Sequence, residues 1–264
     1  MTANLTRLTS LDVSGSKLSD VRKQTLRLIV KKMRKLNVQN CRLSYEQLDE
    51  IFDTLSGENS CIEELMIGSN NLSKVSSELL RKAVSKLKLL HCDNCFMNDQ
   101  ISNQKISEML KEIDQGSTCM LENLNLNMNS MLQINFTLIS SLSRLRIVSL
   151  YGCDTILAAL LENLIQTENI SLKDLNIGNS DLTLYPPSMV SKSLVRLETV
   201  NLSDCDVTPM HVTMLLTSIA TKESVNLKKL VMTGIDYSTF VDIPGLVEKA
   251  KEKLVHFELS AKYI

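Results

Sequence analysis

An eleven-residue pattern returns along almost the whole chain, and it limits the possible fold more than any other feature of the sequence. The pattern is L-x-x-L-x-L-x-x-N/C-x-L, with other aliphatic residues in place of some leucines. Its fourth position falls at residues 11, 36, 65, 90, 124, 148, 175, 200, 230 and 257, so successive copies lie 24 to 34 residues apart. Nine full copies and a partial C-terminal one cover 1–264, which predicts a single domain built as a stack of repeats.

Each copy predicts one short β-strand followed by a helix. Side chains alternate across a strand, so positions four and six enter the core, whereas positions three, five and seven point away from it. Between the strands, Ser44 stands where an N-cap is expected and Pro209 at the first position of another helix. Strand and helix alternate about every 27 residues, which predicts parallel strands. We therefore expect an α/β solenoid, a right-handed horseshoe with the sheet on its concave face and the helices on its convex face.

The ninth position of the pattern alternates between cysteine and a more polar residue over eight copies. Its side chains belong to a tight bend after the strand, where we expect them to satisfy backbone groups that otherwise lack partners. This alternation, together with the helical outer segments, resembles the ribonuclease-inhibitor-like leucine-rich-repeat family, which includes the sensor regions of NLR-type receptors. The resemblance covers essentially the whole chain. It implies a binding scaffold in which the residues shared by the family maintain the fold. The residues at position nine are Ser16, Cys41, Asn70, Cys95, Asn129, Cys153, Ser180, Cys205 and Ile235.

Composition excludes several other classes of protein. With 29 basic and 30 acidic residues, the chain lacks the overall positive charge of a nucleic-acid-binding protein. A hydrophobic fraction of 44% excludes an intrinsically disordered chain. The N-terminal sequence has no apolar core typical of a signal peptide, and no apolar stretch is long enough to span a membrane. Seven dispersed cysteines do not indicate a secreted disulfide framework, so we expect a cytoplasmic protein.

The sequence offers little support for catalysis or metal binding. Cys92 and Cys95 form a C-x-x-C pair, which can indicate redox or zinc chemistry. The repeat places Cys92 at position six and Cys95 at position nine, and this favours a structural role for both. The three histidines lie far apart, and neither glycine-rich phosphate-binding motif occurs. We therefore predict no catalytic residue, no cofactor and no metal.

The outward positions of the strands are the predicted binding surface. Met66, Leu89, Ile147 and Tyr151 are apolar or aromatic among small polar neighbours, which is typical of an interface anchor with a polar rim. The alternative is that the asparagines only solvate the sheet or form ladders between strands, and that the apolar residues are ordinary exposed ones. The residues predicted to bind a protein partner through the concave face are Met66, Leu89, His91, Asp93, Asn125, Asn127, Ile147, Ser149, Tyr151 and Asn176.

A basic stripe runs along the first predicted helix at helical spacing, with apolar residues such as Leu28 on the opposite side. It is either a solvated outer face or a contact for an acidic partner. The residues of this basic stripe are Lys23, Arg27, Lys31 and Arg34.

The sequence favours non-catalytic recognition of a protein partner, like the sensor or autoinhibitory region of NLR-type receptors. Two alternatives are the substrate-recognition part of a ubiquitin-ligase adaptor and, less favoured, a GTPase-activating leucine-rich-repeat protein. The first normally needs an added docking segment, and the second needs a catalytic residue that nothing in the sequence singles out. Neither end has an obvious polar capping repeat, which favours a segment of a larger protein.

Overall fold

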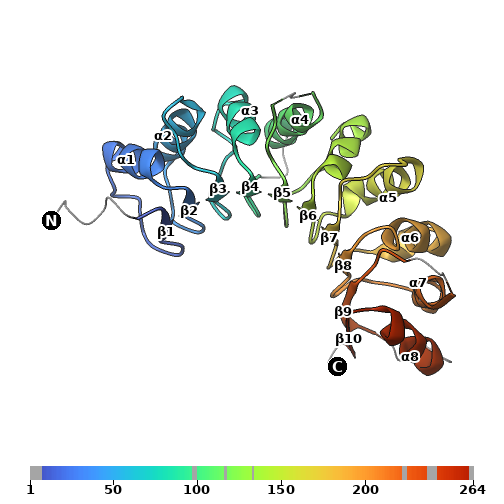
Figure 1. The fold of residues 1–264 in the computed structure, drawn as a ribbon. Coiled ribbons are helices and arrows are strands. Elements are labelled where there is room, and N and C mark those ends of the chain that lie inside the picture. The colour runs from blue at the N-terminus through green and yellow to red at the C-terminus, as the bar shows by residue number, and fades with distance from the viewer. Residues whose placement is uncertain are drawn as a thin grey trace. The chain divides into compact units, whose positions relative to one another are not determined.

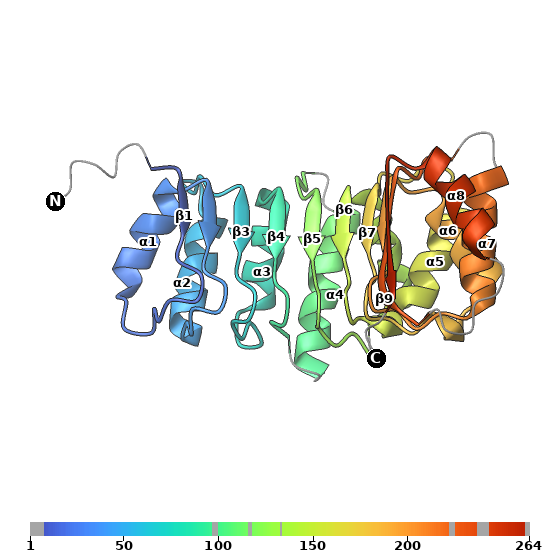
Figure 2. The same ribbon diagram turned by 90° about the horizontal axis from the view of Figure 1, so that it is seen from below.

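The computed structural model describes residues 8–96, 100–115, 118–132, 134–221, 225–236 and 243–261. The chain forms two compact units, residues 1–141 and 142–264, and each is described by itself. In each unit, short parallel strands alternate with helices, and the helices lie along one face of the sheet (Figures 1 and 2). We call the other face of the sheet, in each unit, the open face.

The described residues of the first unit contain five strands that pair in parallel in the order of the chain. Equivalent repeat positions are in register, as in the row of third-position residues Ser10, Lys35, Glu64, Leu89 and Asn123. The elements are β1 (Ser10–Asp12), α1 (Lys23–Lys32), β2 (Lys35–Asn37), α2 (Tyr45–Ser56), β3 (Glu64–Met66), α3 (Ser77–Lys86), β4 (Leu89–His91), α4 (Gln100–Gln115) and β5 (Asn123–Asn125). The 3₁₀ helix η2 (Phe136–Arg144) contains the point of division between the units.

The second unit repeats the arrangement with five further parallel strands in chain order. Its last two strands are seven and six residues long, whereas the others have three. The elements are β6 (Ile147–Ser149), η3 (Asp154–Ile156), α5 (Leu157–Gln166), β7 (Asp174–Asn176), η4 (Leu182–Leu184), α6 (Pro187–Leu194), β8 (Thr199–Asn201), α7 (Pro209–Thr221), β9 (Lys229–Ile235), α8 (Ile243–Lys253) and β10 (His256–Ala261).

The core of each unit lies between the sheet and the helices, as the alternation of the pattern predicts. At position four, Leu65 and Leu124 are completely buried in the first unit, and so are Val200 and Leu230 in the second. Position six is buried in the same way in the inner repeats, for example at Ile67, whereas Val13 and Leu259 in the end repeats are half-buried. Branched aliphatic side chains fill the narrow space between strand and helix, so the repeated leucines build the core. The prediction of an α/β leucine-rich-repeat solenoid is thus confirmed by parallel strands, one-sided helices and this buried register.

The two helix starts predicted from the sequence are present. Ser44 caps α2 in a capping box, in which its hydroxyl accepts a hydrogen bond from the Gln47 amide while the Gln47 side chain accepts one from the Ser44 amide. Pro209 is the first residue of α7. The helix of the basic stripe ends at Lys32, because Met33 is extended, with φ −84° and ψ 146°. Arg34 therefore lies after α1, which corrects its placement on the helix.

Position eight of the repeat has a left-handed backbone in all nine full repeats, a feature that the sequence pattern did not reveal. This conformation turns the chain out of the strand, and it favours glycine and, among other residues, asparagine or aspartate. Seven of the nine residues are of these three types, and the remaining two are serine and methionine. The residues and their φ angles are Gly15 (72°), Asn40 (52°), Ser69 (56°), Asn94 (51°), Met128 (57°), Gly152 (68°), Asn179 (53°), Asp204 (60°) and Gly234 (69°).

Met128 is the least suited of these residues, and its replacement by glycine is expected to stabilise the protein. The side chain is 56% exposed, so little packing is lost. Glycine removes the strain of the left-handed backbone, but it also has a greater entropy cost on folding. The net result should be a free energy of unfolding that is higher by about 0.5–1 kcal/mol. Chemical denaturation measures this change. As a control, Met120→Gly at another half-exposed position without positive φ should not stabilise the protein.

The side chains at position nine satisfy backbone groups in several repeats, as the sequence predicted, whereas the Ser180 hydroxyl is buried without a hydrogen-bond partner among the described residues. The thiols of Cys41, Cys95 and Cys205 donate to carbonyl oxygens of the preceding repeat, at sulfur–oxygen distances of 3.1, 3.4 and 3.2 Å. Asn70 accepts from the Leu43 amide and donates to several carbonyls. Neighbouring repeats are therefore joined by side-chain hydrogen bonds inside the turn as well as by the sheet.

Candidate binding surface on the open face

The open face of the first unit holds a small apolar group on β3 and β4. Met66 is directly opposite His91 in the parallel register, and Leu89 is opposite Glu64. All four side chains are partly buried, so the predicted anchors Met66 and Leu89 are neither core residues nor fully exposed. Burial lowers the pKa of His91, although the charges of Asp93 and Glu64 act in the opposite direction. His91 is thus largely neutral near pH 7 and extends the apolar surface.

Asp93, another predicted site residue, is held in place by neighbours on two sides. Gln39 Nε2 donates a hydrogen bond to Asp93 Oδ1 at 3.0 Å from two repeats away. The carboxylate lies over Gly68 of the repeat between them, where an added Cβ would be 2.3 Å from Asp93 Oδ1. The absence of a side chain at Gly68 therefore makes room for this bridge. Asp93 forms a fixed acidic border beside Met66 and His91.

The predicted asparagines form internal hydrogen bonds in both units. Asn125 Oδ1 accepts from the Asn127 amide at 2.9 Å, and Asn176 Oδ1 accepts from the Gly178 amide at 3.0 Å. Asn176 Nδ2 also donates to Ser149 Oγ on the neighbouring strand at 3.0 Å. These contacts support the alternative in which polar columns stabilise the turns and link the strands. The sequence prediction that these residues bind a partner remains untested.

Tyr151 in the second unit lies against the sheet and does not stand out from it. Its ring passes over Gly178, where an added Cβ would be 2.8 Å from the ring carbon Cδ2. The hydroxyl donates to Asp204 Oδ2 at 3.2 Å, again two repeats away. Burial and the nearby Asp204 charge raise the pKa of Tyr151. Ile147 lies on β6 beside Asp174 of β7 and is partly buried, so it and Tyr151 belong to a separate surface in this unit.

A column of alternating charge at position two was missed by the sequence analysis. Glu198 bridges Lys173 at 2.6 Å and Lys228 at 2.7 Å, and these two lysines lower the pKa of Glu198 to about 2. In the first unit, Glu63 likewise pairs with Arg34 and Lys88. The signal was available, because basic and acidic residues alternate immediately after the first leucine of successive repeats from Arg34 to Arg146, and again from Lys173 to Lys228.

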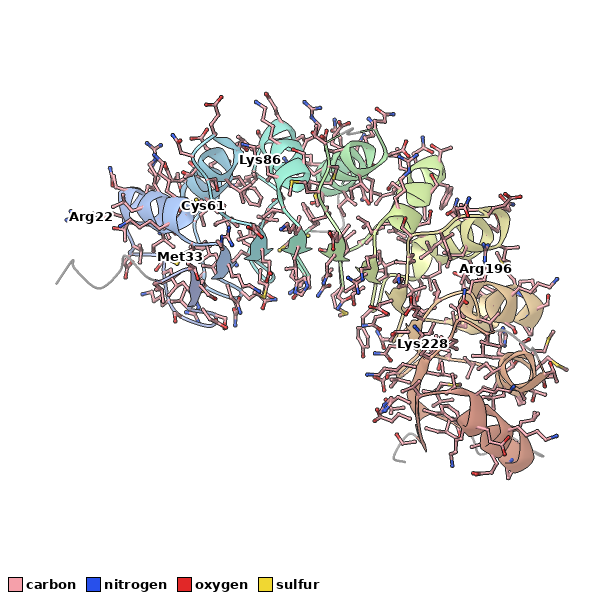
Figure 3. All side chains as sticks on the ribbon, in the orientation of Figure 1. Arg22, Met33, Cys61, Lys86, Arg196 and Lys228 are labelled. Carbon is pink, nitrogen blue, oxygen red and sulfur yellow. The ribbon has the colours of Figure 1, made fainter. Side chains whose placement is uncertain are left out.

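Arg196, labelled in Figure 3, caps a helix beside this charged column. It lines a hollow of about 440 Å³ on the second unit. Its guanidinium donates to the carbonyl oxygens of Leu164, Ile165, Thr167 and Glu168, where α5 ends. These carbonyls carry the negative end of the helix dipole, so a cation is favoured there. The main polar groups of the hollow are thus already paired with one another, which indicates a structural role.

The cysteine pair has no arrangement suited to chemistry. Cys92 and Cys95 are both buried, and burial raises the pKa of Cys95 to about 12. Both thiols therefore stay protonated, as a structural role requires. Cys61, which precedes β3, is exposed. Within the described part of the chain, no group of three or more His, Cys, Asp or Glu residues could hold a metal ion.

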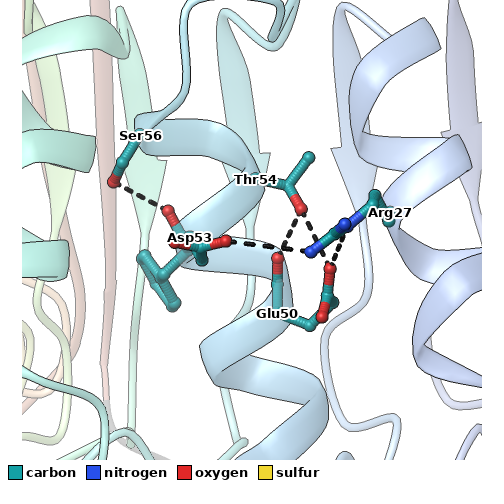
Figure 4. A network of polar contacts seen from close by, with 6 residues as sticks. Arg27, Glu50, Asp53, Thr54 and Ser56 are labelled. Carbon is teal, nitrogen blue, oxygen red and sulfur yellow. Dashed lines mark hydrogen bonds and ion pairs between the residues drawn. The ribbon is translucent and has the colours of Figure 1, made fainter.

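The basic stripe is engaged in part by the neighbouring helix. Arg27 Nε contacts Glu50 of α2, and its guanidinium lies 4.0 Å from Asp53 (Figure 4). Arg34 pairs with Glu63 at 3.5 Å. The buried residues of α1 are Leu26 and Val30, and Leu28 is 59% exposed, contrary to its expected place on the inner side. The unpaired surface of the stripe is thus smaller than the sequence indicated.

Comparisons with known proteins found similarities to solved structures. No protein-family model matches the chain, and no curated protein matches it significantly. The leucine-rich-repeat-containing protein LegL7 from Legionella pneumophila is similar in structure, with 17% identity, a TM-score of 0.49, and coverage of 93% of this chain and 91% of its own. The tropomodulin C-terminal domain of Caenorhabditis elegans has 16% identity, a TM-score of 0.36 and coverage of 60% and 85%. No described helix has both the length and the apolar character needed to cross a membrane.

Proposed function

We propose that the chain is a non-catalytic scaffold that binds a partner protein through the open face of its first unit. The observation that carries this proposal is the apolar group of Met66 and Leu89, which His91 extends and which the fixed polar side chains of Asp93 and Asn125 border. When a partner binds and displaces water, polar groups that already have hydrogen-bond partners cost little free energy, whereas the burial of apolar atoms is favourable. Such a surface suits a partner with an apolar side chain and few charges.

The proposal extends to the kind of protein. The alternation at position nine and the outer helices support a ribonuclease-inhibitor-like repeat, similar to the sensor region of a cytoplasmic NLR-type receptor. A ubiquitin-ligase adaptor would use the same surface and differ in what is attached to the repeats. For the GTPase-activating alternative, Arg196 on a rim of the second unit offers no support, because its guanidinium is committed to four carbonyl oxygens. Recognition without catalysis is therefore the favoured function.

A photo-crosslinking amino acid at Leu89 tests this proposal. In cytosol, we expect this chain to form one discrete covalent adduct, and the same group at Leu28 on the outer helix to form none. With the partner so identified, Met66→Ser together with Leu89→Ser should weaken binding at least tenfold, because both anchors are lost. Leu28→Ser is the matched control. Unchanged affinity of the double variant, with weaker binding of Leu28→Ser, would contradict the proposal.

A further inference from the structure

Four aspartates of the turns after β6, β7 and β8 lie on one rim of the second unit, where the strands end and the helices begin. Asp154 follows β6, Asp181 follows β7, and Asp204 and Asp206 follow β8. The turns that carry them touch: Asp181 and Asp206 form a β-bridge, and Tyr151 of the β6 turn donates to Asp204. We call these four residues the acidic rim.

Among the residues that the structure describes, the acidic rim has no cation to balance it. None of its carboxylates forms an ion pair with any residue that the structure describes, and the side-chain partners of Asp181 and Asp204 are the neutral Thr183 and Tyr151. Asp154 Oδ1 is buried and has no hydrogen-bond partner within the described residues. The turn segments 150–157, 177–187 and 202–211 contain no lysine or arginine. By contrast, Glu198 on the opposite rim is paired with two lysines.

Two large apolar side chains stand exposed beside the acidic rim. Leu184, at the end of η4, is 68% exposed, and Met210, in the first turn of α7, is 58% exposed. The two turns are in contact, since the His211 Nε2 atom lies 2.9 Å from the carbonyl oxygen of Tyr185. Neighbouring aliphatic side chains with charged residues at their border are typical of an interface anchor.

We propose that this rim is a second docking surface, and that it takes a basic protein segment with aliphatic side chains. Lysines or arginines of the segment pair with the acidic rim, and its aliphatic side chains cover Leu184 and Met210. The charge sets the occupant: four carboxylates without cations repel a nucleic acid or an anionic lipid surface and attract a cationic peptide. The site lies in the other unit from Met66 and Leu89, so it does not rest on the function proposed above.

The probe is a labelled peptide of alternating lysine and leucine. Its binding to the full chain is measured by fluorescence anisotropy in 0.15 M salt. We expect saturable binding of this peptide and no binding of the same peptide with glutamate in place of lysine. Asp181→Asn with Asp206→Asn should weaken binding about tenfold, since two exposed ion pairs are lost. Leu184→Ser with Met210→Ser should weaken it at least as much.

The matched control removes the same charge elsewhere on the unit. Glu162→Gln with Glu168→Gln changes two exposed acidic residues away from the acidic rim and should leave the affinity for the peptide unchanged. All substituted residues except Asp181 are exposed and Asp181 is half-buried, and thermal melting of each variant confirms that the fold is kept. The proposal is wrong if the lysine–leucine peptide does not saturate, if the control weakens binding equally, or if Leu184→Ser with Met210→Ser has no effect.

Discussion

Replacement of Asn129 by alanine is expected to lower the free energy of unfolding by about 3 kcal/mol or more. Asn129 is 1% exposed and sits at position nine of its repeat. Its Oδ1 atom accepts from the amides of Cys95 and Phe96, and its Nδ2 atom donates to the carbonyls of Cys92 and Leu126, all at 2.9 Å. Alanine leaves these buried backbone groups without that partner, and each costs about 1–3 kcal/mol if no water replaces it.

Urea denaturation of the full chain measures this loss. Asn59→Ala, at an exposed position of the same unit, is the matched control and should change the free energy of unfolding by less than about 0.5 kcal/mol. Asn129→Asp separates size from hydrogen bonding, because an aspartate fills the same space but cannot donate to the two carbonyls. If Asn129→Ala were as stable as Asn59→Ala, the side chain would not be what joins these repeats.

Replacement of Gly178 by alanine is the second change with a large expected effect. It should lower the free energy of unfolding by about 2–3 kcal/mol. The new Cβ would lie 2.7 Å from the carbonyl oxygen of Ser203 and 2.8 Å from the Tyr151 ring. The ring can move, but the carbonyl belongs to the backbone of the next repeat, so the two repeats must separate slightly. The hydrogen bond from Tyr151 to Asp204 should be lost with this movement.

Gly245→Ala is the control for a glycine that has space around it. Gly245 lies in α8, and an added Cβ there meets nothing within 4 Å. Because alanine has a higher helix propensity than glycine, the free energy of unfolding of this variant should rise by about 0.5–1 kcal/mol. The melting temperature should therefore fall for Gly178→Ala and rise for Gly245→Ala. The same direction for both would show that the close approach at Gly178 is not what determines its effect.

The strands, helices and core could be predicted from the sequence because leucine spacing alone determines them. Positions four and six had to face the helices, and Leu65 and Ile67 do. The position-nine contacts were also predictable, since a buried turn needs a polar or thiol side chain. The left-handed turn at position eight was missed because asparagine and glycine there look like ordinary loop residues. The column as a whole, rather than any one residue, carries the signal.

The candidate site was less predictable than the fold. The sequence placed Met66 and Leu89 on the outward face correctly, but it could not show that Asp93 and Tyr151 are held by partners two repeats away. Those bridges depend on the size of the residue between them, Gly68 or Gly178, and on rotamers that sequence spacing does not determine. The acidic rim could likewise not be predicted from the sequence, because its four aspartates come together only when the turns are placed side by side.

The hydrogen bonds from position nine also bear on how the protein unfolds. In a one-dimensional Ising description of a repeat protein, stability is divided between the intrinsic free energy of each repeat and the coupling to its neighbour. Asn70 and Cys41 bond to the backbone of the preceding repeat, so they contribute to coupling. Strong coupling makes a partly folded array costly, because each boundary between folded and unfolded repeats breaks such bonds. Amides in adjacent turns of one unit should therefore exchange with solvent deuterium together, as one cooperative block, rather than repeat by repeat.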